Sequence, residues 1–83
     1  MDMRLDKYLK VSRLIKRRTV ANEACDAGKV LVNDKVARAS YDVKPDDVIV
    51  LTLGTRQMKV KVVSIQETVA KNDAAMLYEI LPN

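Results

Sequence analysis

The chain has 83 residues, of which 15 are Lys or Arg, 11 are Asp or Glu, one is Cys and none is His. A chain of this length forms one domain and buries only about 60% of the surface that its unfolded form exposes, so it has little room for an enclosed active site. The single cysteine excludes an internal disulfide and fits a reducing compartment. No apolar run approaches a signal peptide or the roughly 20 residues of a membrane span, so we expect a soluble, cytoplasmic protein with no membrane association.

Apolar spacing predicts a first amphipathic helix over roughly residues 4–14, with Leu5, Tyr8 and Leu9 toward the core and Asp2 as a candidate cap. A second helix is predicted over about 18–27. Its apolar face is expected to hold Val20, Ala21, Ala24 and Cys25. Gly28 then suits the left-handed position that ends a helix. Two short helices in this order resemble a helix-turn-helix.

After Gly28 the apolar period changes to two, which is typical of strands. We expect strands at 30–32, 35–37, 48–53 and 58–62, and a last strand in which Met76, Tyr78 and Ile80 alternate. Asn33-Asp34 suits a type I′ hairpin turn, and residues 44–47 form a turn with Pro45 at its second position. Residues 66–75 are polar, typical of a loop or short helical turn. The fold class is therefore α+β: two N-terminal helices packed on a small, mostly antiparallel sheet.

Charge is concentrated in residues 4–18, here called the basic block, which holds seven cations and one acid, Asp6. Such a surface favours a polyanion, most commonly nucleic acid. Four of the cations recur every three residues and should fan across the outer half of the first helix: Arg4, Lys7, Lys10 and Arg13. The other three, Lys16, Arg17 and Arg18, stand at the entrance to the second helix.

That entrance is unfavourable for cations, because a helix N-terminus already carries partial positive charge and exposed N–H groups. Three cations there make sense if an external phosphate binds beside them. Arg17 and Arg18 can hold a phosphate with two hydrogen bonds each, and Lys16 supplies a point charge. Two roles are open for Asp6: an ion pair with Lys10 one turn later, or orientation of a neighbouring arginine such as Arg18.

Catalysis has few candidate residues. Cys25 falls on the apolar face of the second helix, as expected of an inert buried thiol, and Asp46-Asp47 is a turn pair rather than a catalytic dyad. No metal-ligand spacing or phosphate-binding glycine loop is present, so we expect no enzyme activity, no metal and no cofactor. The scarcity of aromatic residues favours recognition of folded RNA through shape and phosphate over base stacking. Lys29, Lys35 and Arg38 are interpreted as solubilising residues that flank the first hairpin.

An ordered set of motifs resembles the RNA-binding domain first known from small-subunit ribosomal protein S-four, also called the alpha-L motif. The set comprises Arg4-Leu5-Asp6, the basic pair that opens helix two, residues 24–28, residues 30–33 and residues 41–49. It implies one RNA-binding domain over 1–83, with a core module at about 3–53 and C-terminal strands at 56–81. Two positions depart from the family: Arg17 replaces a capping Ser or Thr, and Asp46 replaces a Gly, which favours a type I turn over type II.

Nearly the whole chain is similar to the RqcP family of bacterial ribosome-associated quality-control factors, relatives of the small heat-shock protein that rescues obstructed large subunits. The resemblance implies binding to large-subunit ribosomal RNA and P-site tRNA, support of alanine tailing by a partner that recruits tRNA, and a monomer off the ribosome. The RNA-binding residues it implies are Arg4, Asp6, Lys7, Arg17 and Arg18, supported by Lys10, Arg13 and Lys16. The alternatives are a heat-shock-type rescue factor, a helix-turn-helix DNA-binding regulator and a basic protein-interaction domain.

Overall fold

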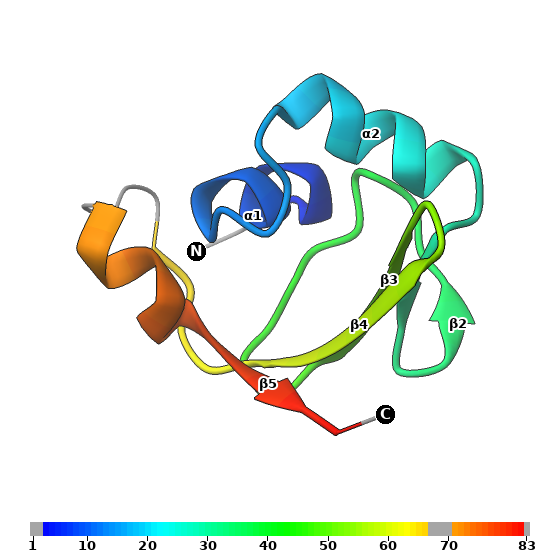
Figure 1. Ribbon diagram of the computed structural model, residues 1–83. Coiled ribbons are helices and arrows are strands. Elements are labelled where there is room, and N and C mark those ends of the chain that lie inside the picture. The colour runs from blue at the N-terminus through cyan, green and yellow to red at the C-terminus, as the bar shows by residue number, and fades with distance from the viewer. Residues whose placement is uncertain (1–2, 67–70, 83) are drawn as a thin grey trace.

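The computed structural model describes residues 3–66 and 71–82. Two helices, α1 (Leu5–Val11) and α2 (Arg18–Asp26), lie together on one side of a curved antiparallel sheet (Figure 1). The sheet has the order β2-β1-β3-β4-β5, and a 3-10 helix, η1 (Lys71–Leu77), precedes its last strand. The strands are β1 (Val30–Val32), β2 (Lys35–Val36), β3 (Val48–Leu53), β4 (Arg56–Val62) and β5 (Tyr78–Leu81). The predicted α+β class is confirmed.

Helix α1 is anchored through its first backbone N–H groups, which have no partner within the helix. Leu5 N donates to the Tyr41 carbonyl at 2.8 Å, and Asp6 N donates to the Ala39 carbonyl at 3.1 Å. The backbone between β2 and β3 thus caps α1, whereas the Arg4 side chain makes no capping hydrogen bond. The candidate cap Asp2 lies outside the described residues.

Helix α1 ends three residues before the predicted boundary, because Arg13 adopts a left-handed conformation with φ +63°. Arg13 N donates to the Lys10 carbonyl, and Ile15 N donates to the Leu9 carbonyl, both at 3.0 Å. These bonds close the last turn without glycine. The prediction that Arg13 continues the fan on the first helix was therefore wrong: it lies beyond the helix, in the connection to α2.

Helix α2 ends as its sequence predicts. Gly28 has φ +75°, Gly28 N donates to the Cys25 carbonyl, and Lys29 N donates to the Ala24 carbonyl, both at 3.0 Å. This pair of bonds defines a Schellman motif. Val20 was wrongly placed on the apolar face, since it is 43% exposed. The buried residues are Ala21, Ala24 and Cys25, spaced i, i+3, i+4. Val20 precedes Ala21 by one residue, and the helical rotation over that residue turns its side chain away from the buried face.

Two turns carry positive φ at residues other than glycine. Asn33 and Asp34 have φ +52° and +69°, which confirms the type I′ turn between β1 and β2. Asp46 has φ +77°, and Asp47 N donates to the Lys44 carbonyl at 3.1 Å, so the 44–47 turn is type II and the predicted type I was wrong. The cause is tertiary: Asp46 N donates to the Val62 carbonyl and Val62 N to the Asp47 carbonyl, both at 2.8 Å.

The core lies between the helices and the face of the sheet that carries Ile49, Leu51, Val60 and Val62. Tyr8 is fully buried there, and its hydroxyl donates to the Leu77 carbonyl at 2.7 Å. Leu77, the last residue of η1, is buried, as is Ala74 in the same helix. The predicted strand face was wrong for Met76, which lies in η1 and is 70% exposed.

Candidate nucleic-acid interface

The two helices are joined at their N-termini by one buried carboxylate. Asp6 is only 2% exposed, and Arg4 Nε and Arg18 Nη2 donate to its Oδ1 at 3.2 Å and 3.4 Å. Asn22 Nδ2 donates to Oδ2 at 3.2 Å, and the backbone N of Lys7 donates to Oδ1 at 2.8 Å. Of the two roles predicted for Asp6, the structure shows the second, orientation of arginine.

This carboxylate stays charged. Burial raises the pKa of Asp6, but hydrogen bonds from Asn22, Arg4 and Arg18, together with the charge of Arg18, outweigh burial and bring the pKa below its ordinary value. The two arginine side chains remain about half exposed, at 51% for Arg4 and 48% for Arg18. Each guanidinium is therefore held on one side by Asp6 and open to solvent on the other.

The entrance to α2 carries no anionic or side-chain cap. Arg17 occupies the cap position in an extended conformation, makes no side-chain cap bond, and is followed by a first turn without an acid. Because the helix begins at Arg18, Thr19 lies inside it and does not cap it either. Lys16, Arg17 and Arg18 are all exposed beside this end. An uncapped N-terminus with three cations is chemically suited to an oxyanion such as phosphate.

The remaining cations of the basic block are Lys7, Lys10 and Arg13. Lys7 is half-buried and Lys10 exposed on α1, whereas exposed Arg13 lies beyond it. Hydrogen bonds thus join Arg4, Asp6 and Arg18 directly.

Sequence reasoning missed Asn22, which completes the binding of Asp6. Its signal was available, because Asn22 follows Arg18 by four residues and so lies on the same face of α2. A hollow of about 380 Å³ lies along this face, lined by Asp6, Arg18, Thr19, Asn22 and Glu23.

The other polar groups have structural roles. Cys25 is a buried free thiol whose pKa rises to about 11, mainly through burial, so it is mostly protonated at neutral pH. Asp47 is 8% exposed and accepts hydrogen bonds from the Tyr41 hydroxyl at 2.9 Å and the Lys44 backbone N at 2.9 Å. Within residues 3–66 and 71–82, acidic and thiol groups do not gather into a metal site, and no helix is long and apolar enough to cross a membrane.

The chain is similar to known proteins in both sequence and fold. Residues 3–49 match the S4 domain family. The chain is 50% identical to the RQC P-site tRNA stabilizing factor of Halalkalibacterium halodurans, over 94% of this chain and 89% of that protein. It is 49% identical to the protein of the same name in Bacillus subtilis, over 95% and 92%.

Two solved structures share the fold. One is described as the trimeric structure of Vibrio cholerae heat shock protein 15, with a TM-score of 0.91 and 28% identity, covering 98% of this chain and 83% of that one. The solution structure of the hypothetical protein HP1423 has a TM-score of 0.82 and 30% identity, covering 98% and 99%. The matched segment includes Asp6, both of its arginines and the entrance to α2, and the chain belongs to the S4 domain family and, within it, to the family of RQC P-site tRNA stabilizing factors.

Proposed function

We propose that this chain is a non-enzymatic RNA-binding factor of the large ribosomal subunit that stabilises P-site tRNA during ribosome-associated quality control. In this role it supports the addition of C-terminal alanine to stalled nascent chains. The observation that carries the proposal is the buried Asp6, which holds Arg4 and Arg18 beside the uncapped start of α2. The names of its relatives, RQC P-site tRNA stabilizing factors, supply the tRNA and the quality-control process.

The mechanism is electrostatic. Residues 1–83 act as one domain that presents cations to ribosomal RNA and tRNA phosphates at once, which lowers the free energy of one tRNA position. Arg17 and Arg18 grip phosphate at the α2 entrance, and Asp6 orients the second of them. Lys16, Arg4, Lys7, Lys10 and Arg13 add charge around this centre. Its partners are large-subunit RNA, tRNA and a tRNA-recruiting protein on the same ribosome; off the ribosome it is a cytoplasmic monomer.

The salt dependence of binding tests the electrostatic mechanism. If about five phosphates are neutralised, log K for large-subunit binding falls against log salt with a slope of roughly −3.5 to −4.5. A slope near zero contradicts the mechanism and favours a protein-interaction domain. Excess duplex DNA should not compete, whereas competition by DNA at stoichiometric amounts would support a DNA-binding regulator.

A charge-reversal pair tests the residues. Arg17→Glu with Arg18→Glu should abolish co-sedimentation with large subunits while the circular dichroism spectrum stays native. The matched control reverses Arg56 and Lys59, which lie on β4 and outside the basic block. It changes net charge equally and should retain most binding. A folded Arg17/Arg18 variant that still binds overturns the assignment.

A heat-shock-type rescue of obstructed large subunits is the second candidate, favoured by the similarity to Vibrio cholerae heat shock protein 15. Both functions require large-subunit binding. They separate in cells that lack the factor: quality control predicts loss of alanine tails on a stalled reporter, whereas rescue without tailing predicts unchanged tails.

A further inference from the structure

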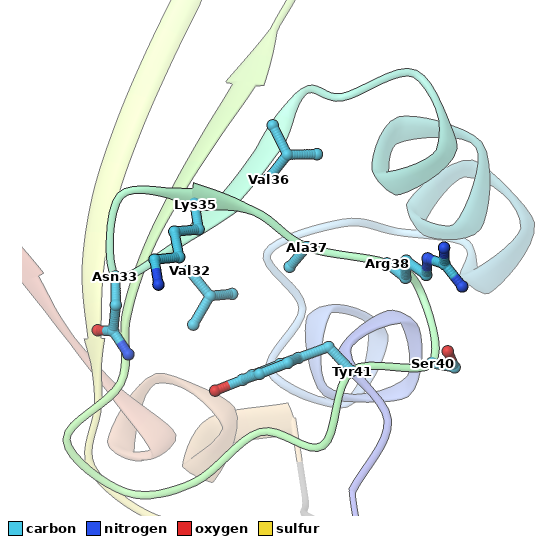
Figure 2. Close-up of a pocket in the computed structure, with 8 residues that line it drawn as sticks. All are labelled: Val32, Asn33, Lys35, Val36, Ala37, Arg38, Ser40 and Tyr41. Atoms are coloured by element: carbon cyan, nitrogen blue, oxygen red, sulfur yellow. The ribbon is translucent and has the colours of Figure 1, made fainter.

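A second concave feature lies away from the α2 entrance, between the β1–β2 hairpin and the chain that leaves it. This hairpin hollow has a volume of about 550 Å³, which is within the range of roughly 300–1,000 Å³ common for small-molecule sites. It is lined by Val32, Asn33, Lys35, Val36, Ala37, Arg38, Ser40 and Tyr41 (Figure 2).

The hollow is lined by both apolar and cationic side chains; among the apolar ones Val36 is 65% exposed, whereas Val32 and Ala37 are buried. Figure 2 shows the Tyr41 ring edge-on, with Val32 and Ala37 on one side of the ring plane. Lys35 extends over the hollow toward Val32, and Arg38 points away from Tyr41. An aromatic ring beside two cations fits a ligand that is planar at one end and anionic at the other, as a nucleotide is.

One buried carboxylate, that of Asp47, holds side chains on both sides of the hollow in place. Asp47 accepts the Tyr41 hydroxyl at 2.9 Å from one wall and Asn33 Nδ2 at 3.1 Å from the other. The Oδ1 of Asn33 accepts from Val48 N at 3.0 Å, which ties the hairpin turn to β3. The hollow is therefore formed before any ligand binds, which lowers the entropy cost of binding.

Neighbouring hollows from the hairpin hollow to the α2 entrance share lining residues. An adjoining hollow of about 510 Å³ shares Val36, Ala37, Arg38 and Ser40 with it and extends to Arg4 and Asn22. Asn22 in turn lines the hollow beside Arg18. Each of the three hollows is therefore lined by at least one cation: Lys35 and Arg38 in the first, Arg38 and Arg4 in the second, and Arg18 in the third.

We propose that the hairpin hollow binds one nucleotide of an RNA strand that passes along these three hollows, with its base against Tyr41. Its flanking phosphates contact Arg38 and Lys35. The proposal rests on the proposed RNA-binding function and extends it to residues that sequence reasoning had interpreted as solubilising.

Neutralisation provides the first test. Lys35→Gln with Arg38→Gln should weaken binding to large subunits by roughly tenfold or more, the scale of a lost charge-assisted hydrogen bond. It should also reduce the magnitude of the salt slope by about 1.4–1.8, the share of two phosphates. Arg56→Gln with Lys59→Gln removes the same charge elsewhere and should change the slope little. Equal effects of the two pairs would overturn the proposal.

Position-specific crosslinking provides the second test. A benzophenone amino acid in place of Val36, at the rim of the hollow, should crosslink to one or two adjacent nucleotides of large-subunit RNA or tRNA. Ile80 on β5 is the matched control, because the two side chains are 65% and 64% exposed and both lie on strands. Position 80 should give no such RNA adduct. Absence of an RNA adduct at 36, or an equal adduct at both positions, refutes the nucleotide site.

The two tests separate this proposal from the function on which it rests. If the unmodified protein does not bind large subunits, the proposed function fails. If it binds them and the hollow variants bind equally well, the function stands and the hairpin hollow is no nucleotide site.

Discussion

Arg13 should be unfavourable for the fold and favourable for binding, so one substitution is expected to move stability and affinity in opposite directions. Its φ of +63° puts an L-residue with a Cβ in the left-handed region, at a cost of roughly 1–2 kcal/mol. Arg13→Gly removes that cost but adds chain entropy to the unfolded state. We expect a net gain of about 1 kcal/mol in the free energy of unfolding, which raises Tm by roughly 4–8 °C in a domain of this size.

The same change removes one cation from the basic block. If Arg13 contacts a phosphate, Arg13→Gly should reduce the magnitude of the salt slope by about 0.7–0.9. Thermal unfolding followed by circular dichroism measures the first effect, and salt titration of large-subunit binding measures the second. Arg13→Lys is the control that keeps the charge and the backbone strain, so both readouts should stay near those of the unmodified protein.

Gly28 provides a reference for the energetic cost of a left-handed backbone, because it holds the equivalent position after α2 at φ +75°. A Cβ built there meets no atom within 4 Å, so Gly28→Ala adds backbone strain without a clash. It should lower stability by about 1 kcal/mol, as Arg13→Gly raises it. If Arg13→Gly destabilises the protein while Gly28→Ala behaves as expected, the reasoning about strain at Arg13 is wrong.

Three further substitutions test the contacts that hold the site and the core. Asp6→Asn should cost about 1–2 kcal/mol at pH 7, since it removes charged hydrogen bonds to half-exposed arginines. Because folding lowers the pKa of Asp6, its stabilisation is complete above the ordinary pKa of 3.8 and is lost as pH falls through the folded value. Urea unfolding at pH 7 and pH 3 should show the gap between the two proteins narrowing at the lower pH, and a constant gap contradicts the assignment. Tyr8→Phe should cost about 1 kcal/mol in the same assay, because the Leu77 carbonyl loses its hydroxyl donor; no change would mean that water replaces it. Asp46→Gly should stabilise the type II turn by about 1 kcal/mol, and a loss of stability would show that the Asp46 side chain matters more than its φ of +77°.

The features that the sequence predicted correctly are those set by neighbouring residues. Gly28 ends α2 because a residue without Cβ fits the left-handed position, and Asn33-Asp34 closes a two-residue hairpin because both residues tolerate positive φ. The apolar alternation of Met58, Val60 and Val62 also places β4 correctly against the core. In each case the signal and the structure it produces lie within a few residues of one another.

Two of the errors, at Asp46 and Met76, involve contacts from a distant part of the chain. Asp46 takes positive φ because Val62 binds the backbone on both sides of it. Leu77, not Met76, packs into the core formed by distant residues, and its carbonyl accepts a hydrogen bond from the hydroxyl of Tyr8, 69 residues earlier. Local spacing carries no information about such contacts, so the alternation read from residues 76–80 could not identify the buried face.

The role of Asp6 shows the same limit at the candidate site. Both Lys10 and Arg18 were plausible partners from the sequence, and only the packing of α1 against α2 brings the second within 3.4 Å. Which of the two residues pairs with Asp6 determines how this carboxylate affects the basic block. A pair with Lys10 would be a local helix contact, worth a few tenths of a kcal/mol. The contact with Arg18 instead places a buried negative charge among the cations, which offsets their repulsion and holds two guanidiniums in place before RNA arrives. If these arginines bind RNA as proposed, Arg4 and Arg18 lose less side-chain entropy on binding than Arg17, which makes no side-chain cap bond at the start of α2.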